Sequence, residues 1–144
     1  MSNVIYFDTS ALAKWYINEC NSEDVETYLQ KNGPVAVSDL TVVEMRCLLA
    51  RRRREKNISV MLETEIFATF QEDIRRKFLI CHPFPHDLAV GTVNLMSILG
   101  DIPVRSLDAM HLVIAKEIGA DIIVTADKVM ADAATAYSFE VVRF

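Results

Sequence analysis

Residues 4–13, VIYFDTSALA, place four apolar residues directly before a carboxylate and a helix-forming run. This pattern predicts a buried strand, a tight turn and a helix that is capped by the hydroxyl of Thr9 or Ser10. Open α/β sheets bind ligands at the carboxyl edge of their parallel strands, so Asp8 is expected at a position suited to chemistry. The alternative for Asp8 is a structural interaction with the N-terminus of the new helix.

Apolar strands alternate with helices along the rest of the chain. Further strands are expected at residues 35–38, 78–81, 121–125 and 139–142. This alternation predicts a parallel sheet with right-handed crossovers. The long helix expected at residues 40–54 and the helix after it would form an αα-hairpin. Because no internal repeat or linker is found, a single domain is expected over residues 1–144.

The composition is typical of a folded domain in a reducing compartment. With 144 residues and 51% hydrophobic residues, the chain can bury a sizeable core. Its cysteines, Cys20, Cys47 and Cys81, are odd in number and far apart, so they fit neither a disulfide framework nor a zinc site. We expect a cytoplasmic protein, because the sequence has no signal-peptide pattern and no apolar run long enough to cross a membrane.

Basic residues are concentrated in two places, although the net charge is -5. One is an unbroken arginine run with a further arginine nearby, and the other covers residues 75–77. Such a distribution can steer an anionic polymer such as RNA to one face of the protein. The alternative is two solvated helix ends, where basic residues interact favourably with the helix dipole. The members of the first cluster are Arg46, Arg51, Arg52, Arg53 and Arg54, with Lys56 nearby.

Four acids lie near the ends of the predicted strands or the starts of the predicted helices. Asp8 follows the first strand, Glu44 is near the start of the helix after the second, and Asp127 comes two residues after the fourth. Helices begin at the carboxyl ends of strands in a parallel sheet, so these three acids should converge on one edge. Asp108, in the first turn of a buried helix, is not placed by this rule.

Each acid also has a structural explanation. Glu44 completes a capping box with Thr41. Asp127 is a good N-cap, and Asp108 interacts favourably with the helix dipole. Together, however, such acids repel, since two carboxylates about 5 Å apart cost roughly 3 kcal/mol at an effective dielectric constant of about 20. An all-oxygen cluster suits Mg²⁺ or Mn²⁺ rather than zinc, and His111 is expected to pack or hydrogen-bond beside Asp108.

Four stretches resemble the motifs of the PIN-domain ribonucleases and, within them, of the VapC toxins of toxin–antitoxin pairs. They occur in the order of the family and cover essentially the whole chain. The resemblance implies a three-layer α/β/α sandwich with a central parallel sheet of strand order 3-2-1-4-5. The stretches are Asp8-Thr9-Ser10-Ala11-Leu12, Thr41-x-x-Glu44, Ser106-Leu107-Asp108-Ala109 and Val124-Thr125-Ala126-Asp127.

The same resemblance implies an activity and partners. It implies cleavage of RNA that depends on Mg²⁺ or Mn²⁺, at an acidic site made of Asp8, Glu44, Asp108 and Asp127. Because the last segment is the most variable part of the family, Asp132 is an alternative for the fourth acid. The family also suggests a homodimer and a small VapB-like antitoxin that blocks the acidic site.

The main hypothesis is therefore an endoribonuclease that hydrolyses phosphodiester bonds with metal-activated water. The four acids would hold the metal, while Ser10 and Thr125 would orient ligands or waters from behind them. The arginine run would bind the RNA backbone. Trp15 or Tyr16 would either stack on an unpaired base or, as the pattern favours, pack in the core.

Two other functions stay open at this point. Phosphotransferases and receiver domains that are phosphorylated on an Asp also carry it at a strand end, but the phosphatase motif has a second Asp where this chain has Ser10. A non-catalytic RNA-binding or partner-binding module, in which the acids serve only as helix caps, is the other alternative. Nucleotide-binding loops are disfavoured, because the four glycines form neither a dinucleotide-binding fingerprint nor a P-loop.

Overall fold

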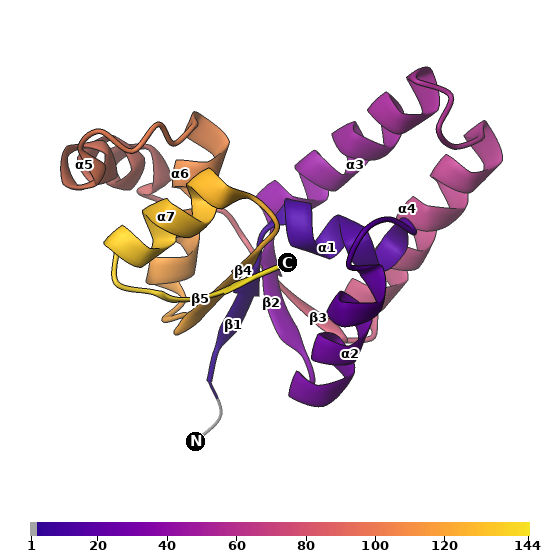
Figure 1. Ribbon diagram of the computed structural model, residues 1–144, viewed down its shortest axis with the longest axis horizontal. Coiled ribbons are helices and arrows are strands. Elements are labelled where there is room, and N and C mark those ends of the chain that lie inside the picture. Colours follow the sequence, from indigo (N-terminus) through magenta and orange to yellow (C-terminus); the bar gives the residue numbers. More distant parts are fainter. Residues whose placement is uncertain (1–2) are drawn as a thin grey trace.

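The computed structural model describes residues 3–144 (Figure 1). All five expected strands are present, and their ends differ from the expected ends by one residue at most. Within residues 3–144, no helix has the length and apolar character needed to cross a membrane. The elements are β1 (Ile5–Phe7), α1 (Thr9–Tyr16), α2 (Ser22–Asn32), β2 (Val35–Ser38), α3 (Asp39–Arg54), α4 (Val60–Arg75), β3 (Leu79–His82), α5 (Leu88–Leu99), α6 (Ser106–Glu117), β4 (Ile122–Thr125), α7 (Lys128–Ala136) and β5 (Glu140–Arg143).

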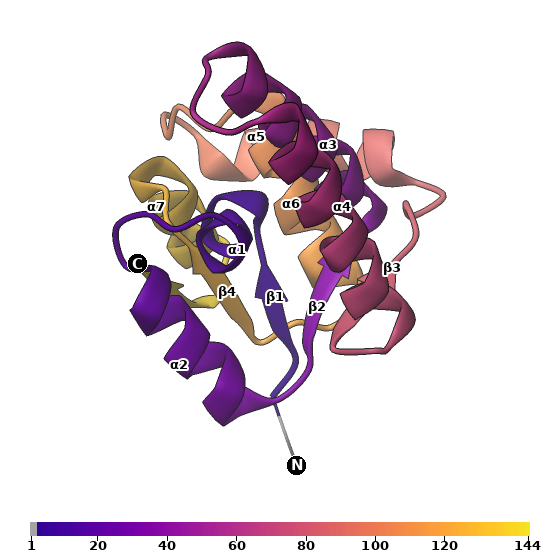
Figure 2. The same cartoon turned by 90° about the vertical axis from the view of Figure 1, so that its right-hand side faces the viewer.

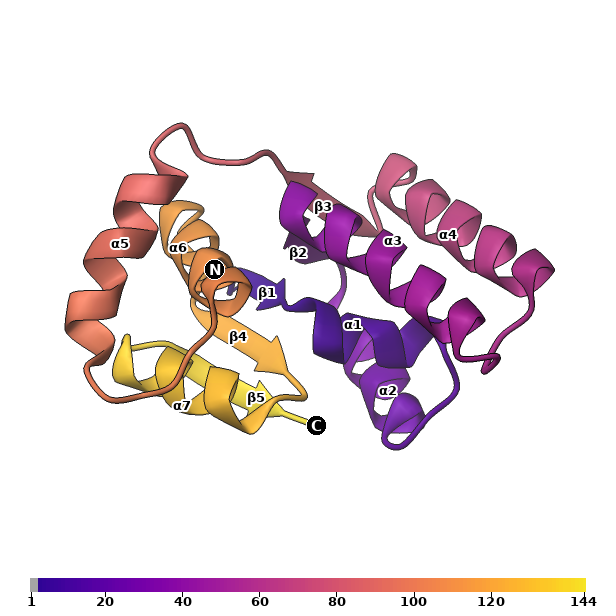
Figure 3. The ribbon, with the colours of Figure 1, turned by 90° about the horizontal axis from the view of Figure 1, so that it is seen from above.

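The five strands form one parallel sheet in the order β3-β2-β1-β4-β5, which confirms the expected topology. β1 lies at the centre, where Tyr6 is paired with Ala36 of β2. On its other side Phe7 is paired with Val124 of β4. Because the strands are parallel, the helices after β1, β2 and β4 all begin at the same edge of the sheet, which Figure 3 shows from above.

Helices cover both faces of this sheet, as expected for an α/β/α sandwich. α1 to α4 pack on one face and α5 to α7 on the other (Figures 1 and 3). Side chains of β1 alternate between the two layers: Ile5 and Phe7 belong to the first apolar cluster and Tyr6 to the second. Tyr6 is fully buried, so its hydroxyl needs a hydrogen-bond partner inside an otherwise apolar layer.

Two helices begin differently from the sequence-based expectation. The N-cap of α1 is Asp8 rather than a hydroxyl residue, and its carboxylate accepts a hydrogen bond from the Ala11 backbone N–H (3.1 Å). α3 begins one residue earlier than expected, after Ser38, whose backbone N–H donates to Thr41 Oγ1 (3.0 Å). The expected capping box between Thr41 and Glu44 is therefore wrong, because Thr41 itself completes the cap. Glu44 lies nearly one turn further along α3, where its carboxylate is available for other contacts.

α3 and α4 form the expected αα-hairpin (Figure 2). Between them, Glu63 is only 5% exposed and pairs with Arg46 Nη1 (3.0 Å) and Arg53 Nε (2.7 Å). A buried carboxylate needs such partners, because an unpaired buried charge is strongly destabilising. The hydroxyl of Tyr16 donates to Asp73 of α4 (2.6 Å), which fastens the hairpin to α1.

α5 and α6 approach each other closely at Gly91, where an added Cβ would lie 2.9 Å from Val113 Cγ1. Overpacking costs about 1–3 kcal/mol, whereas Ala gains about 1 kcal/mol over Gly in helix propensity. We expect Gly91→Ala to lower the free energy of unfolding by about 1 kcal/mol in urea denaturation. In a Val113→Ala background the same change should be neutral or stabilising, since the clash is gone. Equal effects in both backgrounds would contradict the close contact.

Candidate active site

Four acids from four different parts of the chain line one open cavity of about 840 Å³ at the carboxyl edge of the sheet. Asp8 follows β1, Glu44 is on α3, and Asp127 precedes α7. Asp108, which the sequence pattern did not place, reaches the same cavity from the first turn of α6. The structure therefore brings together all four acids that were singled out from the sequence.

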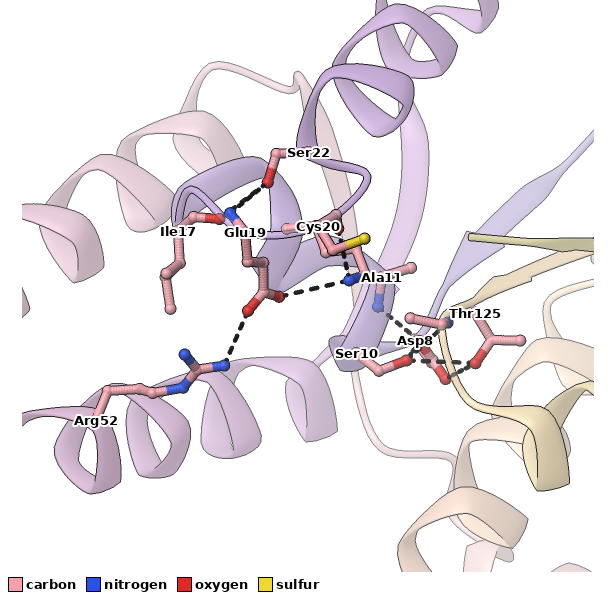
Figure 4. A network of polar contacts seen from close by, with 11 residues as sticks. Asp8, Ser10, Ala11, Ile17, Glu19, Cys20, Ser22, Arg52 and Thr125 are labelled. Carbon is pink, nitrogen blue, oxygen red and sulfur yellow. Dashed lines mark hydrogen bonds and ion pairs between the residues drawn. The ribbon is translucent and has the colours of Figure 1, made fainter. Parts of the chain in front are cut away.

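Asp8 is 3% exposed and is held by three hydrogen bonds (Figure 4). Its Oδ1 accepts from the backbone N–H of Ala11 and from the Ser10 hydroxyl (2.7 Å), and its Oδ2 accepts from the Thr125 hydroxyl (2.5 Å). Burial raises the pKa of Asp8 above its ordinary value, while these hydrogen bonds oppose the rise. Asp8 is thus both the cap of α1 and part of the cavity wall, so the two interpretations of this residue are compatible.

The two hydroxyl residues that were expected to support the acids are joined to the start of α7. The Ala126 backbone N–H donates to Ser10 Oγ (2.9 Å), and the Asp127 backbone N–H donates to Thr125 Oγ1 (3.0 Å). The Asp127 carboxylate in turn caps α7 by accepting from the Met130 N–H (2.9 Å). The ends of β1 and β4 are therefore connected behind the acids by side-chain hydrogen bonds.

Asp132, the alternative fourth acid, lies elsewhere. It forms an exposed ion pair with Lys128 one turn away on α7 (3.0 Å) and is not among the residues that line the cavity. Asp127, which does line it, therefore has the better placement of the two.

Glu44 is oriented by side chains from both sides of the sheet. Its Oε1 accepts from the Thr9 hydroxyl (2.8 Å) and is hydrogen-bonded to His111 Nε2. Burial opposes ionisation of Glu44, but the hydrogen bond and charge of His111, together with Thr9, lower its pKa below the ordinary value. His111 was expected beside Asp108, and instead the structure joins it to Glu44.

Sequence reasoning missed the residues behind His111. His111 is 1% exposed, and its Nδ1 is hydrogen-bonded to the Tyr6 hydroxyl (2.6 Å), which also contacts Ser38 Oγ (2.8 Å). The available signal was a tyrosine in the centre of a buried strand, because a buried phenol needs a polar partner.

Asp108 has the fewest hydrogen-bond partners of the four acids. Within residues 3–144, no hydrogen bond engages its carboxylate. Burial and then the negative charges of Asp8 and Asp127 raise the pKa of Asp108 from 3.8 to about 6, with a smaller contribution from Glu44. The repulsion inferred from the sequence is therefore present in the folded protein.

The arginine cluster divides into two groups. Arg51 and Arg54 are exposed and line the cavity, and no carboxylate within residues 3–144 forms an ion pair with either. Arg52 pairs instead with Glu19 (3.0 Å), as Figure 4 shows. Arg46 and Arg53 are engaged by the buried Glu63 described above.

The sequence reasoning also passed over Arg105, an exposed residue directly before α6 that lines the same cavity. Arg105 is the N-cap residue of α6, and no local sequence pattern indicated that it would reach the cavity. Trp15 and Tyr16 pack against the core cluster, as the sequence favoured, and neither lines the cavity.

The oxygen-rich lining fits a hard divalent cation, since carboxylate oxygens are the ligands that Mg²⁺ and Mn²⁺ prefer. Within residues 3–144, no three His, Cys, Asp or Glu side chains are already arranged as a set of metal ligands. Carboxylate oxygens of Asp8 and Glu44 instead accept hydrogen bonds from side chains of the protein. Burial and then the neighbouring acids raise the pKa of Asp108, so a nearby cation would favour its ionised form.

Comparisons with known proteins were made for both sequence and structure. Residues 5–136 match the PIN domain family. No curated protein matches the sequence. The structure is similar to VapC20 from Mycobacterium tuberculosis, described as a sarcin-ricin loop cleaving toxin, with a TM-score of 0.73, 17% identity, and 97% and 99% of the two chains covered.

Two further solved structures share the fold. FitAcB from Neisseria gonorrhoeae has a TM-score of 0.68 at 18% identity, with 96% of each chain covered. VapBC2 from Rickettsia felis, bound to a DNA fragment from its promoter, has a TM-score of 0.69 at 12% identity, with 98% of each chain covered. At these identities the likeness establishes the fold.

Asp108 provides a test of the charge crowding in metal-free protein. Its pKa is higher in the folded protein than in the unfolded chain, so the folded protein binds the proton more tightly. The free energy of unfolding should therefore fall as the pH rises from about 4 to about 6, by at most about 3 kcal/mol from this group. Asp108→Asn should remove this contribution, so its stability relative to wild type should improve over that range in urea denaturation with EDTA. A stability difference that is independent of pH would contradict the crowding.

Proposed function

This chain belongs to the PIN-domain family, and we propose that it is a metal-dependent endoribonuclease, the toxin of a toxin–antitoxin pair. The observation that carries the proposal is a single cavity lined by four carboxylates and bordered by arginines that have no carboxylate partner within residues 3–144. Acids are the groups that hold a hydrolytic metal ion, and arginines are groups that bind phosphates. The two together suit a phosphodiester substrate.

Asp8, Glu44, Asp108 and Asp127 are proposed to hold Mg²⁺ or Mn²⁺. When bound, such an ion lowers the pKa of a water molecule and offsets the charge that develops on the phosphate. Ser10 and Thr125 are proposed to keep the buried Asp8 carboxylate in one orientation through the hydrogen bonds described above.

RNA binding is proposed for the arginines that border the cavity. Arg51 and Arg54 come from α3, whereas Arg105 comes from the start of α6, so basic groups from two helices reach the acidic floor. Guanidinium groups bind phosphates irrespective of base sequence. The other members of the cluster, Arg46, Arg52 and Arg53, are held in ion pairs and are proposed to support this wall rather than to contact RNA.

The proposed partners are RNA, a small VapB-like antitoxin and a second copy of the chain, acting together in the cytoplasm. The similar structures support the antitoxin at the level of the family, because FitAcB and VapBC2 are among them. The homodimer is supported by α5, which carries no charged residue and exposes Val90, Val93 and Ile98 by 60% or more. Two such helices can meet without repulsion between like charges.

The two alternatives from the sequence receive less support. Phosphorylation of Asp8 is less well supported because the phosphatase motif has a second Asp where this chain has Ser10, and the Ser10 hydroxyl instead donates to Asp8 (2.7 Å). A purely structural role for the acids does not explain Glu44, since it does not cap its helix. Asp108 lies in the first turn of α6, where the helix dipole favours an acid, but its carboxylate has no hydrogen-bond partner within residues 3–144 and its pKa is raised by burial and by neighbouring acids.

Cleavage of RNA is expected to require the metal and the acids. Wild type should cut RNA in Mg²⁺ or Mn²⁺ and stop in EDTA. Asp8→Asn, Glu44→Gln and Asp108→Asn should each lose more than about 100-fold in rate, because changes to residues that merely orient a metal ligand already cost about 10–100-fold. The measurement is the initial rate on a labelled RNA, with folding checked by circular dichroism.

Asp132→Asn is the matched control, since it neutralises an acid that lies outside the cavity lining. Its rate should equal that of wild type. Wild-type rates for the three cavity variants, or cleavage that persists in EDTA, would refute the proposed function.

Two double variants in the last turn of α3 compare the arginines that are proposed to bind RNA with the arginines that are held in ion pairs. Arg51→Gln with Arg54→Gln should weaken binding to unrelated RNAs. The slope of log affinity against log salt concentration should also become shallower by the equivalent of about two phosphate contacts, because fewer counterions are released. Arg52→Gln with Arg53→Gln removes the same charge but from paired residues. This control should reduce thermal stability more and RNA affinity less. Equal losses of affinity in the two double variants would refute the division.

A further inference from the structure

Behind Glu44, a row of buried polar side chains crosses an otherwise apolar layer. Ser38 Oγ, the Tyr6 hydroxyl, the His111 ring and the Glu44 carboxylate are hydrogen-bonded in that order. Ser38, Tyr6 and His111 are at most 1% exposed. Their neighbours in this layer include aliphatic side chains such as Leu112, which lies next to His111 on α6. Apolar residues would fill this volume without the cost of burying polar groups, so packing alone does not explain the row.

The row ends at one oxygen of the cavity wall. An ionised Glu44 only accepts hydrogen bonds, so His111 donates from Nε2. The other ring nitrogen, Nδ1, is hydrogen-bonded to the Tyr6 hydroxyl, which also contacts the Ser38 hydroxyl. The imidazole is therefore held at both of its nitrogens, and this fixes the orientation of the ring that faces Glu44.

Only one of the two Glu44 oxygens is engaged in this way. Oε1 receives both Thr9 and His111, whereas within residues 3–144 no hydrogen bond engages Oε2. Glu44 lines the cavity, so Oε2 is the oxygen left for a ligand. His111 also lies three residues after Asp108 on α6, which places the two side chains on the same side of that helix.

We propose that His111, backed by Tyr6, is a positioning residue that holds Glu44 so that its second oxygen can bind the divalent cation. The inference rests on the proposed function and extends it to residues that touch neither the cation nor RNA. Groups that orient a metal ligand by a hydrogen bond typically change metal affinity by about 10–100-fold when they are removed. The effect should therefore appear in metal binding itself, with or without RNA.

Two substitutions at His111 separate orientation from packing. His111→Leu keeps apolar volume but removes the donor, and should raise the Mg²⁺ and Mn²⁺ dissociation constants of the full chain by about 10–100-fold in calorimetric titration. His111→Gln carries an amide N–H that can reach Glu44, and should recover most of the affinity. RNA affinity in EDTA should be unchanged in both, because neither variant alters the arginines.

If His111→Leu does not fold, a matched pair of tyrosine variants, Tyr6→Phe and Tyr16→Phe, tests the same positioning role. Each removes one buried or half-buried hydroxyl with a hydrogen bond of 2.6 Å, but only Tyr6 is joined to His111. Both should lower the melting temperature in EDTA, whereas only Tyr6→Phe should weaken metal binding.

Equal metal affinity for wild type and folded His111→Leu, or equal affinity for the two tyrosine variants, would overturn the positioning role. A wild-type chain that binds neither Mg²⁺ nor Mn²⁺ would overturn the proposed function itself. The two failures are thus distinguished by the wild-type titration.

Discussion

Repulsion among carboxylates is the constraint around which this end of the molecule is organised. Four acids share one cavity, and side chains of Thr9, Ser10, His111 and Thr125 hydrogen-bond to two of them. Asp8 and Glu44 receive hydroxyl, backbone and imidazole donors, whereas Asp108 receives none within residues 3–144 and has its pKa raised to about 6. The central position of β1 makes this possible, because strands on both sides end at the same edge and supply donors from distant parts of the chain.

Structure and chemistry are not competing explanations for these acids. Asp8 caps α1 and Asp127 caps α7, and both also line the cavity. A helix N-terminus supplies partial positive charge, so it stabilises a carboxylate that faces other negative charges. Capping thus lowers the cost of crowding acids together.

The strands and most helix bounds were predictable, because apolar period, turn residues and helix stops are local signals. The order of the strands in the sheet came instead from the resemblance to the PIN-domain family. The residues of the site were only partly predictable from the sequence. Asp8 follows β1 directly and Asp127 comes two residues after β4, whereas the position of Asp108 depends on how α6 packs, which no local pattern records. The Glu44 cap was mispredicted because the cap of α3 is Ser38, three residues before Thr41, and Thr41 accepts from the Ser38 backbone N–H. Likewise, Tyr6 and His111 are 105 residues apart, and their contact follows only from the packed layer.

The double role of Asp8 has an evolutionary consequence. A descendant of this chain without the proposed catalysis would still need the cap of α1 and the hydrogen bond from Thr125 of β4, so selection for folding alone would retain Asp8. Asp108 caps no helix and accepts no hydrogen bond within residues 3–144, and its replacement by a neutral residue would relieve repulsion from the neighbouring acids. Across divergent sequences of this fold, an acid at the Asp108 position should therefore be the more reliable mark of an active enzyme, and a chain that keeps only the capping acids should be suspected of having become a binding protein.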